Sequence, residues 1–272
     1  MTKQSIVLWV VAFFLTVGSA VYQRMTGPSY PLRGAVRLGG KEVPFKFERS
    51  EGQKDAVVKI PTGDPAVRGW LAWKRYRTEE LWTAVPMMYR DNFLQAELPV
   101  QPPAGKVVYR VLLEGAGEQR LVPDGDPVVI RFTGDVPGLI LWPHILVMFL
   151  ALLLSTRAGL EFFSREPQLK NLTYLSLILL FVGGMVLGPI VQKFAFGAYW
   201  TGWPFGGDLT DNKTAVAFLA WVAAALALSR SRRANVWVLA AAIILLLVYL
   251  IPHSLAGSEL EYAPKAPLTA PR

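Results

Sequence analysis

Five long apolar segments dominate this chain of 272 residues. A helix that crosses a bilayer needs about 20 apolar residues. Each segment reaches that length or comes near it, and the fourth can be extended at both ends. The segments cover residues 5–21, 139–154, 172–191, 215–228 and 236–251. The sequence therefore predicts a protein with five transmembrane helices.

Positive charges between these segments predict their orientation. The loops that stay on the cytoplasmic side of a membrane carry an excess of Lys and Arg. The basic residues beside alternate ends of the segments are Lys3, Arg157, Arg165, Lys170, Arg230, Arg232 and Arg233. This places the N-terminus in the cytoplasm and the C-terminus outside, as in a multi-pass protein of the bacterial inner membrane.

The first apolar segment has two interpretations. Gly18 and Ala20 are spaced like a signal-peptidase site, which would allow cleavage. A retained transmembrane anchor helix in residues 1–23 is the favoured interpretation.

Residues 24–136 have a different pattern. Apolar and polar residues alternate, as in "EVPFKFER" with Val43, Phe45 and Phe47, and turn residues recur about every 8 to 12 positions. This predicts an antiparallel β-sandwich on the periplasmic side, inserted between the first two helices. The whole chain is then an α+β membrane protein, with a four-helix transmembrane region in residues 137–253 and an extended periplasmic tail in residues 254–272.

The stretch "LPVQPPAGKVVYRVLLEG" resembles a pattern of immunoglobulin-like and fibronectin-type sandwiches. In those domains a turn with Pro and Gly precedes a strand that has a Tyr near its start, and Tyr109 occupies that place. The resemblance implies an immunoglobulin-like architecture. It implies no ligand, because this fold hosts many functions.

Charge and composition exclude several classes of function. The net charge is +8, but residues 24–136 hold 17 basic and 14 acidic residues, which is no nucleic-acid footprint. The absence of Cys removes disulfides, thiolate metal sites and Cys nucleophiles. The sequence has none of the common hydrolase, nucleotide-binding or zinc-protease motifs. We therefore expect no enzyme, no metal site and no nucleic-acid partner.

The apolar segments are nearly free of ionisable residues. His144 lies in the second segment and Lys193 near the outer end of the third. Transporters and proton relays usually need such groups inside the membrane, so neither function is favoured. Gly183, Gly184 and Gly188 form a small-residue face that predicts close helix packing.

The loop "FGAYWTGWPFGGDLTDNKT", Phe196–Thr214, joins the third and fourth segments on the predicted outer side. Trp and Tyr are enriched at membrane interfaces, so its rings are expected there without any ligand. Asp211 or Thr210 is expected to cap the following helix.

The same loop resembles the tryptophan-rich periplasmic segment of the haem-handling membrane proteins of cytochrome c-type biogenesis. The matching positions are Gly197, Trp200, Trp203, Asp211, Lys213 and Thr214. In that family two histidines on the outer side flank the segment and ligate haem. The resemblance therefore implies a haem site made by His144, His253, Trp200 and Trp203.

Several features depart from that family. Phe196 replaces a leading Trp, and the Asp that should follow the last Trp is delayed to Asp208. The chain also has fewer segments than is usual and carries the extra sandwich. The other interpretation gives both histidines ordinary hydrogen-bonding roles at helix ends.

A second aromatic run, "GWLAWKRYRTEELW", lies in the predicted sandwich. Its rings alternate with basic side chains, which suits either a solvated face with cation–π contacts or a docking surface. The candidate partner-binding residues are Trp70, Arg75, Tyr76, Arg77 and Trp82, together with Tyr199 and Phe205 of the loop.

Elimination leaves three functional hypotheses. The first is a non-enzymatic structural, accessory or assembly subunit of a respiratory or photosynthetic complex of the inner membrane, with membrane lipid and other subunits as partners and no cofactor. The second is a protein that handles haem or another tetrapyrrole. The third is a periplasmic sensor or glycan-binding module.

Overall fold

The computed structural model describes residues 2–165, 167–252 and 257–262. Contacts divide the chain into two compact units. The helical unit holds the described residues of 1–28 and 136–258, and the β unit those of 29–135 and 259–272. The boundaries expected from the sequence lie within a few residues of these, except that residues 259–262 of the predicted tail belong to the β unit.

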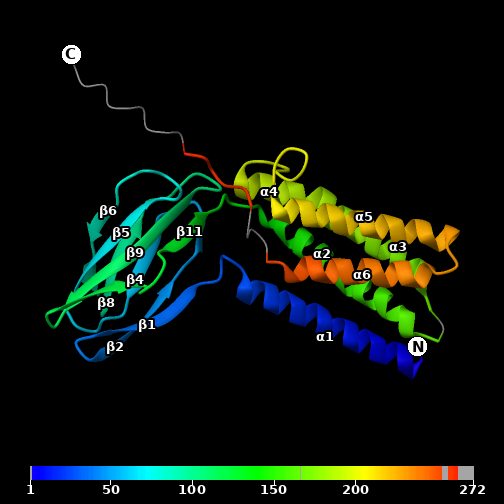
Figure 1. Ribbon diagram of the computed structural model, residues 1–272, viewed down its shortest axis with the longest axis horizontal. Helices are drawn as coiled ribbons and strands as arrows, with labels where there is room; N and C mark the ends of the chain where they lie inside the picture. Colours follow the sequence, from blue (N-terminus) through cyan, green and yellow to red (C-terminus); the bar gives the residue numbers. More distant parts are fainter. Residues whose placement is uncertain (1, 166, 253–256, 263–272) are drawn as a thin grey trace, which may run out of the picture. The chain divides into compact units, whose positions relative to one another are not determined.

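Five helical rods make up the helical unit (Figure 1). The third rod is continuous through an α-helical, a π-helical and a second α-helical part, Leu169–Phe196. The elements of the helical unit are α1 (Lys3–Thr26), α2 (Gly138–Leu160) with the 3-10 turn η1 (Glu161–Phe163), α3 (Leu169–Leu180), the π-helix η2 (Phe181–Leu187), α4 (Gly188–Phe196), α5 (Leu209–Arg230) and α6 (Ala234–Leu250). Each rod contains one of the five predicted apolar segments almost entirely.

The rods are apolar on the outside as well as the inside. Four of them are long and apolar enough to cross a membrane, and α6 is a shorter apolar helix. Only 17–28% of the residues in the apolar windows of those four are buried, and many of the other apolar side chains are exposed or half-buried. A helix that is hydrophobic all round needs lipid or protein against its outer face. The inner core is built from small residues around Trp221, which is completely buried.

The β unit contains eleven strands within its described residues. They are β1 (Leu32–Leu38), β2 (Lys41–Phe47), β3 (Ser50–Glu51), β4 (Ala56–Ile60), β5 (Arg68–Arg75), β6 (Thr83–Pro86), β7 (Met88–Arg90), β8 (Phe93–Leu98), β9 (Lys106–Gly115), β10 (Glu118–Val122) and β11 (Val128–Phe132). One sheet runs β3-β11-β9-β5-β6 with β10 also paired to β9, a second runs β4-β8-β7, and β1 pairs with β2. All pairs are antiparallel except β3 with β11, so the prediction of short antiparallel strands is confirmed.

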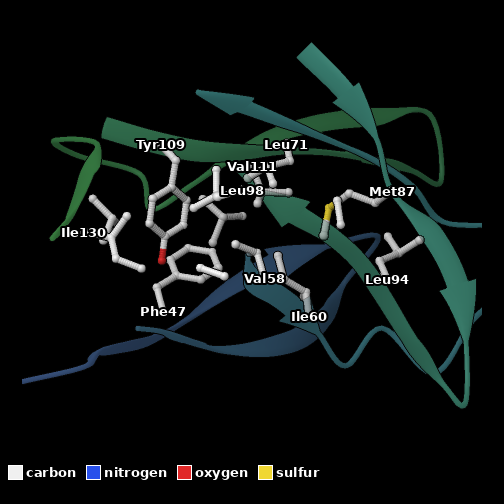
Figure 2. Close-up of a cluster of buried hydrophobic side chains, with 14 of the residues drawn as sticks. Phe47, Val58, Ile60, Leu71, Met87, Leu94, Leu98, Tyr109, Val111 and Ile130 are labelled. Carbon is white, nitrogen blue, oxygen red and sulfur yellow. The ribbon is translucent and has the colours of Figure 1, made fainter. Parts of the chain in front are cut away.

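One core joins the three sheets (Figure 2). It forms because each strand buries alternate residues, most regularly in β9, where Val107, Tyr109, Val111 and Leu113 point inward. The Tyr109 hydroxyl donates to the carbonyl oxygen of Glu48 at 2.9 Å, and burial raises the pKa of this phenol. In immunoglobulin domains the corresponding hydroxyl bonds backbone only a few residues upstream. Here it ties β9 to the connection after β2.

Candidate functional site

The first turn of α5 holds the backbone of the loop before it. α4 ends at Gly197, whose φ of +88° favours glycine. The Oδ2 atom of Asp211 then accepts hydrogen bonds from the backbone N–H groups of Thr201 at 2.6 Å and Gly202 at 2.9 Å. Oδ1 of Asn212 accepts one from the N–H of Trp203 at 2.6 Å. Three consecutive residues of the loop are therefore fixed to the helix.

Asp208 is the residue that caps α5. Its Oδ1 accepts from the N–H of Thr210 at 2.7 Å. The expectation that Asp211 or Thr210 would be the cap is wrong, because the helix begins two residues before Asp211 and the Asp211 carboxylate turns back to the loop. The Oδ2 of Asp208 accepts from the N–H of Ser258 at 2.8 Å and from the Thr201 hydroxyl at 3.1 Å.

The aromatic rings of the loop differ in exposure. The indole N–H of Trp200 donates to the carbonyl oxygen of Trp203 at 3.1 Å, which keeps the Trp200 ring against the loop. Trp203 and Phe205 leave 78% and 81% of their surface exposed. Tyr199 is also exposed, and the Lys193 ammonium lies 5.5 Å from its ring centre. The predicted crowding of rings is real, but the outermost rings point away from the protein.

A cavity of about 330 Å³ lies between the helices of the helical unit and is partly open to its surface. Residues from α1, α2, η2, α4, α5 and α6 line it. Its apolar lining includes Ile145, Met148, Phe149, Val191 and Phe196. Its polar lining includes Gln23, His144, Gln192, Asp208, Asp211 and Tyr249. A mostly apolar cavity with a few convergent polar groups is the usual form of a small-molecule site.

His144 is anchored to the π-helix in this cavity. Its Nδ1 lies 3.0 Å from the carbonyl oxygen of Gly183, to which the N–H of Gly188 also donates. A carbonyl oxygen only accepts, so Nδ1 carries the proton and the neutral ring keeps a lone pair on Nε2. π-Helical turns are frequent at functional sites because they alter which backbone and side-chain groups face a cavity.

The described residues among those implied for haem divide between this cavity and the loop. His144 lines it, whereas Trp200 and Trp203 are not among the described lining residues. His253 lies outside the described residues. Among the described residues, no group of three or more His, Cys, Asp and Glu side chains could hold a metal ion.

Ionisable residues inside the helical unit are more numerous than the sequence suggested. Asp208, Asp211 and Lys213 are all buried near the start of α5, and the Lys213 ammonium donates to the carbonyl oxygen of Ile251. The predicted segment 215–228 itself contains no ionisable residue, but α5 begins six residues before it and so adds Asp211 and Lys213 to the helix. The "DLTD" spacing was a usable signal, since acidic residues are favoured at the cap and in the first turn of a helix.

Arg157 also lies elsewhere than expected. It was placed in a cytoplasmic turn, but α2 continues to Leu160, so Arg157 is buried in its last turn. Its guanidinium forms an ion pair with Glu161, which is buried as well, and lies 5.4 Å from the ring centre of Trp9.

The aromatic and basic run of the β unit behaves partly as predicted. Trp73 packs against the core and Trp70 lies on the other face of β5. The Arg110 guanidinium lies 4.8 Å from the ring centre of Trp82, and that of Arg77 lies 5.2 Å from the ring centre of Tyr76. Cation–π contacts therefore form within the β unit itself.

The chain's own C-terminal segment covers part of this candidate docking surface. Glu259 forms ion pairs with Arg77, at 3.0 Å, and with Lys106. The Tyr262 hydroxyl donates to the carbonyl oxygen of Lys106 at 3.1 Å, and the Arg75 guanidinium lies 5.1 Å from its ring centre. Burial lowers the pKa of Lys106 and raises that of Tyr262. Residues 259–262 thus contact both Arg75 and Arg77, although Arg77 stays largely exposed and Arg75 also pairs with Glu80.

No family model matches the chain, and neither the curated proteins nor the solved structures contain a significant match to it.

Proposed function

We propose that this protein is a non-enzymatic accessory or assembly subunit of a larger complex, respiratory or photosynthetic, in the bacterial inner membrane. In this proposal the helical unit crosses the membrane five times with the N-terminus in the cytoplasm. The β unit is an immunoglobulin-like sandwich in the periplasm. The partners are membrane lipid and the other subunits.

The observation that carries the proposal is a set of exposed rings on a fixed loop. Trp203 and Phe205 are each more than three-quarters exposed. The backbone around Trp203 is nevertheless held by the hydrogen bonds to Asp211 and Asn212. Large rings contribute most of the binding energy at protein interfaces. A loop that is already ordered loses little conformational entropy on binding, so its rings favour association.

Lipid is the competing explanation for these rings. Trp and Tyr are enriched at the level of the lipid headgroups because each ring has an apolar body and a polar edge, which is enough to hold it at the interface. A ring that serves as a lipid anchor does not require its backbone to be fixed by two buried or half-buried polar side chains. The fixed backbone therefore favours a protein partner over lipid alone.

The test is co-migration of the solubilised protein with partner subunits. We expect native electrophoresis in a mild detergent to show the full chain in a larger assembly of fixed composition. The double variant Trp203→Ala with Phe205→Ala is expected to reduce its share in the assembly at least tenfold, because loss of one interface ring commonly costs about 2 kcal/mol or more. Trp237 and Leu247 are exposed on α6, so the double variant Trp237→Ala with Leu247→Ala is the matched control.

Three outcomes would count against the proposal. The first is a wild-type protein that migrates alone, and the second is an equal loss of assembly in the loop and control variants. The third is a visible absorption band of haem in the purified protein that disappears in His144→Ala. That band would support the haem alternative instead.

A further inference from the structure

Most of the hydrogen-bond donors around the cavity of the helical unit are already engaged within the protein, although the Gln23 amide retains a second N–H. The Tyr249 hydroxyl donates to the carbonyl oxygen of Met148 at 2.8 Å. The amide nitrogen of Gln23 donates to the carbonyl oxygen of Tyr249 at 2.8 Å. The amide nitrogen of Gln192 donates to the Thr201 hydroxyl at 2.8 Å and to Oδ2 of Asp211 at 3.0 Å. Nδ1 of His144 donates to Gly183, as described above.

These groups can still accept hydrogen bonds from a molecule in the cavity. Nε2 of His144 keeps its lone pair while Nδ1 holds the proton. The hydrogen bonds that reach Asp211 within the described residues all end on Oδ2, which leaves Oδ1 as an acceptor. The amide oxygens of Gln23 and Gln192 are acceptors as well. The cavity wall is therefore rich in acceptors and poor in free donors.

The negative charges of Asp208 and Asp211 do not require a cationic ligand in the cavity. Backbone N–H groups already bind both Asp208 and Asp211, and both residues lie at the N-terminus of α5, whose dipole stabilises negative charge. Among the described residues that line the cavity there is no Lys or Arg to attract an anion. A neutral ligand with a donor at one end satisfies the wall best.

The rest of the wall suits an apolar body. Ile145, Phe149 and Val191 line the cavity beside the polar groups. Its volume of about 330 Å³ lies within the range of small-molecule sites.

We propose that this cavity binds a small neutral molecule with an apolar body and a hydroxyl headgroup that donates hydrogen bonds, the chemistry of a membrane-soluble phenol, quinol or alcohol. The hydroxyl donates to His144 Nε2 or Asp211 Oδ1, and the body packs against Ile145, Phe149 and Val191. This assignment is independent of the accessory role, because it concerns the interior of the helical unit and not its exposed loop.

The test uses Met148, whose side chain lines the cavity, as a reporter. The full chain is placed in lipid nanodiscs with carbon-13 on its methionine methyl groups, and 4-butylphenol is titrated against the matched ether 4-butylanisole. The two probes have nearly the same body, but only the phenol donates. We expect a saturable shift of the Met148 methyl signal with the phenol and binding at least tenfold weaker for the ether. Met87 and Met88, in the β unit, are the internal reference.

Two variants with bulky side chains separate cavity binding from partition into lipid. Ala20 lines the cavity, whereas its neighbour Val21 is exposed. Ala20→Phe is expected to abolish the saturable shift, and Val21→Phe to leave it unchanged. His144→Leu removes one acceptor but keeps an apolar side chain, so we expect at least a fivefold weaker affinity for the phenol.

Four results would overturn the assignment. Equal binding of phenol and ether would show a purely apolar cavity. Tighter binding of protonated 4-butylbenzylamine than of the phenol would show a cation site. The absence of any saturable shift would show a cavity that holds water only. An equal effect of Ala20→Phe and Val21→Phe would show that the probes act from the lipid.

Discussion

Arg157 and Glu161 form a buried ion pair one helical turn apart. Their side chains are 4% and 1% exposed. Glu161 also accepts a hydrogen bond from the N–H of Gln168 at 2.9 Å, which links the end of α2 to the segment before α3. Taking two charges out of water costs several kcal/mol for each charge, and only their mutual attraction compensates for this. Neither residue can therefore be altered alone without a large effect.

Glu161→Gln is expected to destabilise the helical unit strongly. The amide keeps an acceptor for Gln168 but leaves the buried Arg157 charge uncompensated, which costs about 3–5 kcal/mol. Unfolding by denaturing detergent in mixed micelles measures this free energy. The exposed pair Lys46–Glu48 provides the control, because its side chains are 51% and 45% exposed. Glu48→Gln should cost about 1 kcal/mol or less.

The double variant Arg157→Met with Glu161→Gln is the complementary test. Removing both charges should recover most of the stability lost in the single variant, since buried ion pairs are often replaced by apolar residues at little cost. A loss in Glu161→Gln no larger than that in Glu48→Gln would contradict the prediction.

At the scale of elements, α2 and α6 pack closely because Gly159 has no side chain. A Cβ atom at Gly159 would lie 2.5 Å from the Cβ of Ala242 in α6, and that atom moves only with its backbone. Gly183 and Gly184 also make close approaches, to Met148 and Thr214, so the predicted packing role of the small-residue face is confirmed. The packing glycine at Gly159 was not predicted, because a single small residue gives no periodic pattern.

Gly159→Ala is expected to reduce stability, although alanine is the better helix former. The two helices would have to move apart, and overpacking of this kind costs about 1–3 kcal/mol. Gly18→Ala is the matched control, since nothing lies within 4 Å of a Cβ at Gly18. It should be neutral or add up to about 1 kcal/mol. Thermal unfolding of both variants in the same detergent makes the comparison, and equal effects would contradict it.

Hydropathy located the helical rods but not their polar ends. The first turn of α5 contains Asp211 and Asn212, which no measure of apolarity assigns to a transmembrane helix. These side chains are accommodated because they bind loop N–H groups, and such pairings depend on the three-dimensional path of residues 201–203. The cavity was unpredictable for the same reason, since all five helical rods contribute residues to it.

The alternation of apolar and polar residues predicted where the strands lie but not which strands pair with one another. A period of two residues shows which side chains share a face and which, like Trp70 and Trp73, lie on opposite faces, but it carries no information on which strands pair. The parallel pairing of β3 with β11 joins Glu51 to Phe132 across most of the β unit sequence. The binding of Glu259 and Tyr262 to the predicted docking surface was likewise invisible, because their segment lacks any periodic pattern.

At the scale of the whole molecule, the positions of the basic residues agree with the arrangement of the helix ends. The amide of Gln4 donates to the carbonyl oxygen of Phe163 at 2.9 Å, so the start of α1 lies beside the turn that follows α2. Lys3 and Arg165 thus belong to one end of the helical unit. The end of α5 carries Arg230, and the turn before α6 carries Arg232 and Arg233. Basic residues in these turns favour retention of that end in the cytoplasm.

Single cysteines can test this topology, because the chain has none of its own. Asp124 is exposed in the β unit, and Ser231 lies in the turn between α5 and α6. If the β unit is periplasmic, a membrane-impermeant maleimide should label Asp124→Cys in intact spheroplasts and Ser231→Cys only after the membrane is permeabilised. The cysteine-free wild type gives the background. Labelling of Ser231→Cys in intact spheroplasts as fast as Asp124→Cys would contradict the orientation, because charged turns rich in Arg are rarely moved across the membrane.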